Sequence, residues 1–192
     1  MKFTAELFRK KVGSGDLDAT AKKLTTTLAT GGISSVIVGG YALQEHGYHR
    51  NTIDVDVIVP SIPDACEYLS IRGFKPTGSK AILYDRENGV EVNLLPAGGQ
   101  ATRNSPLSIP TPPASPKPMT VMDIAGLIEM KLNVFLGNQT AYLKRKVDVM
   151  ESIKANKLKE NFFHSSNQNI QECWRQTWAE ATQEVDKPDW MG

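Results

Sequence analysis

Two aspartates separated by one residue are the strongest candidates for chemistry in this sequence. Asp54 and Asp56 lie in a run, 53–59, whose other members are all β-branched, and Pro60 ends the pattern. Such a run predicts a strand, and side chains two residues apart on a strand point to the same face, about 7 Å apart. Two carboxylates at this spacing suit one or two Mg²⁺ or Mn²⁺ ions that also contact phosphate oxygens. The sequence therefore predicts a metal site for a phosphate-bearing ligand.

A neighbouring strand offers a third ligand for such a metal. Asn88-Gly89 is a strong hairpin signal between two apolar runs, 81–84 and 90–95, so these runs are predicted to pair antiparallel. We expect the second run to lie beside the aspartate strand. Glu91 and Asn93 share one face of it, and both carry oxygen ligands. Glu91 is also the candidate general base, because a carboxylate can accept a proton and an amide cannot.

A glycine pair precedes the aspartates. Gly39-Gly40 follows a short β-branched run, 33–38, and begins a segment of helical character that ends at Gly47. Glycine allows a ligand to approach the backbone closely, and N–H groups at a helix start suit an anion. The alternative is a tight turn without a ligand. Both interpretations predict a strand, a sharp turn and a helix at this point.

Arg50 and Thr52 alternate with Asp54 and Asp56 along the chain. If the strand geometry extends back to Arg50, all four side chains form one row with a cation, a hydroxyl and two anions. The planar guanidinium of Arg50 either contacts a phosphate or pairs with Asp54 or Glu91.

Together these residues resemble the DNA polymerase beta-like nucleotidyltransferase superfamily, in particular its small prokaryotic-type members. The family pattern is an apolar residue with Gly-Gly or Gly-Ser, a spacer, and then Asp-apolar-Asp/Glu-apolar. Here it reads Val38-Gly39-Gly40 and, after the spacer, Asp54-Val55-Asp56-Val57. The similarity covers about residues 20–155. It implies an α/β (α+β) fold with a small mixed sheet flanked by helices and a C-terminal helical portion. The implied activity is Mg²⁺-dependent transfer of a nucleoside monophosphate from a nucleoside triphosphate to a hydroxyl, with release of pyrophosphate.

The resemblance extends to a later apolar helix that contains Lys131, and to the pattern Lys146-x-Asp148. It implies that Lys146 and Asp148 turn toward the nucleotide, although a short basic run is usually a solvated face. Lys131 lies near the buried side of its helix by its spacing from Ile128 and Phe135. A phosphate contact and an exposed position therefore both stay open for Lys131.

The sequence departs from the family at Asn93, where the hairpin strand usually carries an aspartate. An amide oxygen can bind a cation, but it brings no negative charge. Either Glu91 replaces the missing carboxylate, or the chain is a nucleotide-binding module with weakened or absent catalysis. A third alternative is an α/β protein in which Asp54 and Asp56 form only a polar strand edge.

The length of 192 residues and an ordinary globular composition predict a single domain with one core. We expect a nucleotidyltransferase-type part at 1–96, a proline-rich loop at 97–119 and a helical portion at 120–192. The helical signals lie at about 16–30, 63–73, 120–137, 140–157 and 168–184, and Thr120 is the expected cap of the third.

The net charge and the hydropathy pattern limit the kinds of binding partner that we expect. Twenty-two basic and 21 acidic side chains leave a net charge of +1, so a long nucleic-acid duplex is not an expected partner. The acceptor class stays open among a small molecule, a tRNA end and a protein side chain. No segment has the length of a membrane span and the N-terminus has no signal-peptide pattern, so we expect a cytoplasmic protein.

Overall fold

The computed structural model describes residues 16–79 and 81–183. The N-terminal segment examined above for a signal peptide and the last residue of the helix expected at 168–184 lie outside these residues. Along the chain the elements are α2 (Leu17–Thr30), β1 (Val36–Val38), α3 (Gly39–Glu45), β2 (Asp54–Val59), α4 (Ile62–Ser70), β3 (Phe74–Pro76), β4 (Ile82–Asp85), β5 (Val90–Pro96), α5 (Ile124–Gly137), α6 (Leu143–Asn156), a short 3₁₀ helix (Glu160–Phe162) and α7 (Gln168–Thr182). The expected α+β class with a small mixed sheet is confirmed.

In the described part of the chain, five strands form one sheet in the order β1-β2-β5-β4-β3. β2 and β5 are parallel, whereas the β1–β2, β4–β5 and β3–β4 pairs are antiparallel. The predicted β4–β5 hairpin and its position beside the aspartate strand are therefore confirmed. In this register Asp54 lies opposite Glu91, and Asp56 lies opposite Asn93.

Alternation along β2 explains how the sheet positions the aspartates. Val55 and Val57 are fully buried in the main core together with Leu24 of α2 and Leu69 of α4. Asp54 and Asp56 are only partly buried and, by the period of two, point to the opposite face. The hydrophobic face thus fixes the strand, because a slip of one residue would bury both carboxylates.

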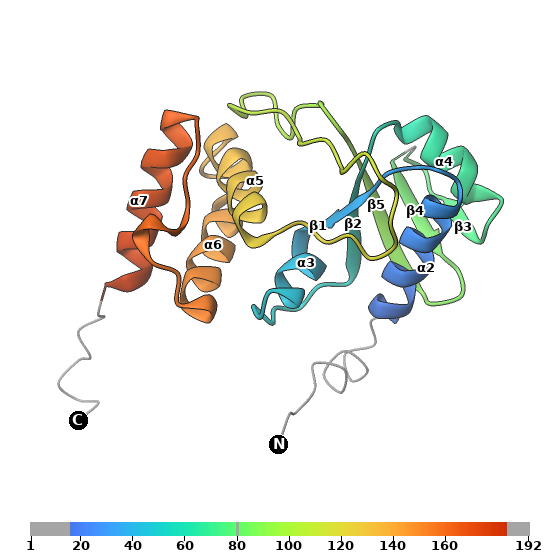
Figure 1. The fold of residues 1–192 in the computed structure, drawn as a ribbon, viewed down its shortest axis with the longest axis horizontal. Helices are drawn as coiled ribbons and strands as arrows, with labels where there is room; N and C mark the ends of the chain where they lie inside the picture. The colour runs from blue at the N-terminus through green and yellow to red at the C-terminus, as the bar shows by residue number, and fades with distance from the viewer. Residues whose placement is uncertain (1–15, 80, 184–192) are drawn as a thin grey trace, which may run out of the picture.

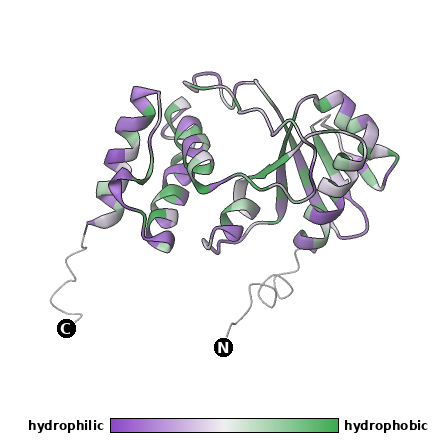
Figure 2. Cartoon of the chain, viewed as in Figure 1, coloured by the Kyte–Doolittle hydropathy of each residue, from purple (hydrophilic) through white to green (hydrophobic). Residues whose placement is uncertain are grey.

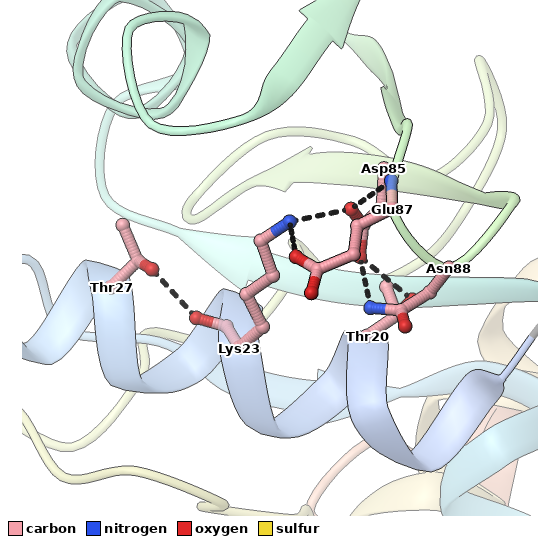
Figure 3. Close-up of polar contacts among 6 residues, drawn as sticks. All are labelled: Thr20, Lys23, Thr27, Asp85, Glu87 and Asn88. Carbon is pink, nitrogen blue, oxygen red and sulfur yellow. Dashed lines mark hydrogen bonds and ion pairs between the residues drawn. The ribbon is translucent and has the colours of Figure 1, made fainter.

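A polar cluster ties α2 to the turn between β4 and β5 (Figure 3). The Asp85 carboxylate is fully buried and accepts hydrogen bonds from Lys23 Nζ (2.7 Å), Thr20 Oγ1 (3.0 Å) and Asn88 Nδ2 (2.7 Å). Lys23 Nζ also contacts Glu87 Oε2 at 3.0 Å. A buried charge of this kind is tolerated because it is both paired and hydrogen-bonded.

The expectation of a single core is wrong. One cluster of buried side chains fills the sheet part, and a second lies among α5, α6 and α7, where Trp174 and Phe163 are packed with their ring centroids 5.3 Å apart. The boundary falls inside α5, because Leu127 belongs to the first cluster and Ile128 to the second. Figure 1 shows these three helices side by side at one end of the molecule.

The hydropathy of the residues also differs between the sheet part and the C-terminal helices. Figure 2 shows hydrophobic residues along the strands, whereas α7 is largely hydrophilic. α7 buries one face only, through Ile170, Cys173, Trp174, Thr177 and Ala181. No helix within the described ranges is long and apolar enough to cross a membrane.

One local expectation is wrong, and one short strand was not predicted. Helix α5 begins at Ile124 and is capped by Asp123, whose carboxylate accepts from the Gly126 N–H, and not by Thr120. The Thr120 carbonyl instead accepts from the Ile37 N–H, and Val121 forms a parallel bridge with Ile37 at the sheet edge. The short strand β3 was not predicted, because Phe74–Pro76 is too brief to show alternation.

Candidate functional site

The two aspartates of β2 are joined by the side chain of Asn93 on β5. Asn93 Nδ2 donates to Asp56 Oδ1 at 3.0 Å and to Asp54 Oδ2 at 3.3 Å. Thr52 Oγ1 donates to the other oxygen of Asp54 at 2.7 Å. Two carboxylates and an amide therefore converge on the face of the β2–β5 pair that points away from the main core.

The Gly39-Gly40 turn allows the backbone to lie against these side chains. Gly39 has φ +72°, and a Cβ on it would lie 1.9 Å from Asp56 Oδ2. A Cβ on Gly40 would lie 2.5 Å from Thr52 Oγ1 and 2.7 Å from an Arg50 nitrogen. All three distances are far below van der Waals contact, so larger residues would displace the polar groups. Helix α3, which starts here, has only seven residues.

The environment of Asp56 favours its neutral form. Burial raises the pKa of the Asp56 carboxyl, and the nearby charge of Asp54 raises it further. The hydrogen bond from Asn93 and the positive charges of Arg145 and Lys131 oppose this rise without cancelling it. The Asp56 carboxyl, with its raised pKa and a second carboxylate close by, has an unmet need for positive charge, which a divalent cation would supply.

Asp56 opens into a pocket of about 260 Å³ between the sheet and the helices. Its wall comes from β1, the end of β5, the loop after β5, α5 and the start of α6. The lining residues of charged type are Asp56, Lys131 and Arg145; the others include Gly39, Leu95, Gln100, Thr102, Ile109, Leu127, Met130 and Tyr142. One carboxylate and two cations thus share a largely apolar pocket, which is the usual character of a small-molecule site.

A buried ion cluster lies beside this pocket. Lys131 Nζ pairs with Asp148 Oδ2 at 2.7 Å, and Arg50 Nε lies 3.3 Å from Asp148 Oδ1. Arg50 therefore pairs with Asp148, so the alternative of a pair with Asp54 or Glu91 is wrong, and its phosphate contact stays a prediction. Burial lowers the pKa of Lys131 to about 8, although Asp148 favours the charged form. Lys131 lies on the buried side of α5, so the exposed alternative is wrong, and its position in the pocket lining leaves a phosphate contact open.

The structure does not bring Lys146 to this pocket. Lys146 Nζ pairs with Glu180 Oε1 of α7 at 2.7 Å and lies 5.7 Å from the centre of the Phe135 ring. Its neighbour Arg145 lines the pocket instead. Arg145 was missed in the sequence, although it is three residues from both Tyr142 and Asp148, which is the spacing of one helix face. That spacing was the signal that could have identified it.

Glu91 lies on the same sheet face, opposite Asp54, but its side chain is exposed. Within residues 16–79 and 81–183, no group of three His, Cys, Asp or Glu side chains is placed to hold a metal ion. The ligand set that the geometry brings together is therefore Asp54, Asp56 and Asn93. An amide can serve a cation only with Oδ1 toward it, so Asn93 would have to rotate its amide away from the two donated bonds.

Comparisons with known proteins do not assign a family to this chain. No model of a known protein family matches it, and no curated protein matches it significantly. The resemblance described above therefore depends on the motif residues of the sequence alone.

Proposed function

We propose that this protein binds a nucleoside triphosphate with Mg²⁺ or Mn²⁺ and transfers its nucleoside monophosphate to a hydroxyl acceptor. The observation that carries the proposal is the pocket in which Asp56, next to Asp54, faces the cations Lys131 and Arg145. A metal–triphosphate needs both: carboxylates for the metal, and cations for the phosphate oxygens that the metal leaves free.

The protein groups have separate roles in this proposal. Asp54 and Asp56 would hold the divalent ion, which when bound supplies charge neutralisation at the phosphates. Lys131 and Arg145 bind phosphate oxygens. Asp148 holds Lys131 in place, and Arg50 pairs with the other carboxylate oxygen of Asp148.

The chemical step is a displacement at the α-phosphorus. The acceptor oxygen forms a bond to phosphorus, the bond to the β-phosphate oxygen breaks, and pyrophosphate leaves. Glu91 is exposed on β5, two residues before Asn93, and is the group available to take the proton of the acceptor hydroxyl.

The position of Asn93 favours a second candidate, a module that binds the nucleotide without turnover. Asn93 occupies the register position opposite Asp56 and bonds to both aspartates, so the place nearest to them holds an amide and no third charge. Two carboxylates can bind one metal ion, whereas a two-metal centre normally has more negative ligands.

The acceptor is proposed only by class. A small molecule, a tRNA end and a protein side chain are all compatible with a near-neutral chain, whereas a long duplex is not favoured at a net charge of +1.

The test has a binding arm and a turnover arm. Calorimetry would measure the affinity for each nucleoside triphosphate with Mg²⁺, for the parent, Asp54→Asn, Asp56→Asn and the control Glu67→Gln, an exposed carboxylate on α4. We expect Mg²⁺-dependent binding by the parent and the control, and loss of that binding in both aspartate variants. Unchanged affinity in both variants would contradict the metal site.

The turnover arm measures pyrophosphate release with Mg²⁺ or Mn²⁺, together with mass spectrometry of the protein to detect self-modification. Release, or a mass increase by one nucleoside monophosphate, supports transfer. Binding without either product across small-molecule, tRNA and protein acceptors supports the binding module.

A further inference from the structure

The first half of the loop after β5 is a clasped segment, residues 98–109. The Gly98 N–H donates to the Ile109 carbonyl at 2.8 Å, and the Ile109 N–H donates to the Gly99 carbonyl at 2.7 Å. Gln100 and Ser108 form an antiparallel bridge just inside these bonds. The two ends of the segment are therefore held together, and the segment is not a free loop.

The segment is also fastened to α5 at Leu107, close to its C-terminal end, by one side chain. Asn133 is only 3% exposed, its Nδ2 donates to the Leu107 carbonyl at 2.8 Å, and its Oδ1 accepts from the Leu107 N–H at 2.8 Å. One amide thus satisfies both backbone groups of Leu107. Figure 1 shows the loop leaving the end of β5, reaching the C-terminal helices and returning.

A second clasp holds the residues that face the pocket. Thr102 Oγ1 lies 2.7 Å from Ser105 Oγ, which also accepts from the Thr102 N–H at 3.1 Å. Thr102, Gln100 and Ile109 line the same pocket as Asp56 and Lys131. Bonds at both ends and at the tip make this segment a fixed wall of the pocket.

The chemistry of this wall differs from that of the charged residues in the pocket. The segment contributes an amide, a hydroxyl and apolar carbon, and the adjoining α5 contributes Leu127, Met130 and Val134. A nucleobase has apolar faces and hydrogen-bonding edges, so it matches this lining. Phosphates match the cations Lys131 and Arg145 instead.

We propose that the 98–109 segment binds the nucleoside part of the triphosphate, with Gln100 contacting the base or sugar, and that Asn133 is its positioning residue. This inference rests on the proposed function, since it assigns the ligand that enters the same pocket. It gives the segment a role in selecting among nucleotides, because a site that hydrogen-bonds one ligand edge rejects ligands that leave its polar groups unpaired.

The experiment compares two ligands that differ only in the nucleoside. Calorimetry with Mg²⁺ would measure the affinity for each nucleoside triphosphate and for inorganic tripolyphosphate, in the parent, Gln100→Ala and Asn133→Ala. Gln139→Ala is the matched control, since Gln139 is exposed at the α5–α6 connection and does not line this pocket. We expect both test variants to lose about tenfold in affinity for the preferred nucleoside triphosphate, the scale of one lost hydrogen bond. Their affinity for tripolyphosphate, and both affinities of the control, should not change.

Each other outcome has a definite meaning. A parent that binds tripolyphosphate as tightly as every nucleoside triphosphate overturns the wall proposal and leaves the metal–phosphate site intact. A parent that binds neither ligand overturns the proposed function itself. Equal losses for both ligands in Asn133→Ala would show a merely structural role for Asn133, and Gln100→Ala, on an exposed side chain, then tests the nucleoside contact alone. Unchanged nucleotide affinity in Gln100→Ala overturns that contact.

Discussion

Asn93 lies directly opposite Asp56 on the parallel β2–β5 pair, and its Nδ2 donates to Asp56 Oδ1 at 3.0 Å and to Asp54 Oδ2 at 3.3 Å. This single amide stands between two carboxylates that would otherwise repel each other. It stabilises them in the absence of a cation, and a cation bound there would have to replace both donated bonds. The properties of the site therefore depend on this residue more than on any other outside the two aspartates.

The first prediction concerns the charge at this position. Asn93→Asp should bind Mg²⁺ more tightly than the parent and should be less stable without metal, because three carboxylates replace two carboxylates and a donor. Thermal unfolding with and without Mg²⁺ measures both effects, since a ligand that binds only the folded state raises Tm. A variant whose Tm responds to Mg²⁺ no more than the parent's would contradict this account of Asn93. Restored pyrophosphate release in this variant alone would identify the parent as a binding module.

The second prediction separates Glu91 from Asn93 in the active enzyme. Glu91→Gln should lower the transfer rate about 10²-fold or more, the scale of a lost general base, while nucleotide affinity stays nearly the same. The side chain is exposed, so the substitution should leave the fold unchanged. Glu67→Gln is the control for removal of an exposed carboxylate elsewhere. An active parent whose rate survives Glu91→Gln would remove Glu91 from the site and leave a two-aspartate centre assisted by Asn93.

The third prediction is that the Asp56 carboxylate is required for binding but lowers the stability of the fold. Its pKa in the folded protein is raised, by burial first and then by Asp54, above the ordinary value of 3.8. The folded state therefore holds this proton more tightly than the unfolded state, and ionisation at neutral pH opposes folding. Asp56→Asn should raise Tm by about 2–4 °C in the absence of metal, the effect of about 1 kcal/mol in a chain of this size, and should abolish Mg²⁺-dependent nucleotide binding. A lower Tm would assign Asp56 to the structure and not to a ligand.

The core of the site could be predicted from the sequence because its geometry is set by short-range patterns. Alternation of aspartate with β-branched residues fixes which face of β2 carries Asp54 and Asp56, and the Asn-Gly turn fixes the β4–β5 pairing. That Asn93 lies opposite Asp56 is a property of the parallel β2–β5 register, for which the sequence holds no local signal.

The parts that could not be predicted depend on which elements meet in space. Consecutive residues on a helix differ by about 100° in direction, so choosing Lys146 in place of Arg145 exchanged a pocket residue for one that faces α7.

The second core was missed because apolar residues on several sides of α5 are compatible with one core or with two. Only the packing of α7, through Trp174, shows that there are two.

The fourth prediction tests whether Arg145 or its neighbour Lys146 binds the nucleotide. Arg145→Gln should weaken nucleoside triphosphate binding about 10- to 100-fold, the range for losing a hydrogen bond to a charged group. Lys146→Gln should change that affinity less than about twofold, because the partner of Lys146 is Glu180 and not the nucleotide. The partly exposed Lys146–Glu180 pair contributes at most about 1 kcal/mol to stability, so its loss should leave the fold intact. The two variants remove the same charge from adjacent positions, so each is the control for the other. The reverse order of effects would place Lys146 at the nucleotide.

The fifth prediction concerns the acid stability of the Asp85 cluster shown in Figure 3. Burial alone would raise the pKa of the Asp85 carboxyl, but hydrogen bonds from Lys23, Asn88 and Thr20 outweigh burial, and its pKa lies below the ordinary value of 3.8. A carboxyl with a lowered folded pKa stabilises the fold above the unfolded pKa of about 4, and this contribution is lost as the pH falls through the folded value. Asp85→Asn should therefore lower the free energy of unfolding at pH 7 by about 3 kcal/mol. We choose the lower end of the range for breaking a buried pair because the Lys23 side chain is 25% exposed.

The difference between parent and Asp85→Asn should shrink as the pH falls below about 4, because the parent carboxyl then also becomes neutral. Urea unfolding at pH 7 and at pH 3 measures it, with Glu67→Gln as the control for removal of an exposed carboxylate. A destabilisation that is equal at both pH values would show that Asp85 stabilises the fold through the geometry of its hydrogen bonds and not through its charge. In that case the Asp85 cluster would not contribute to acid sensitivity, and any acid sensitivity of the fold would have to come from other carboxylates.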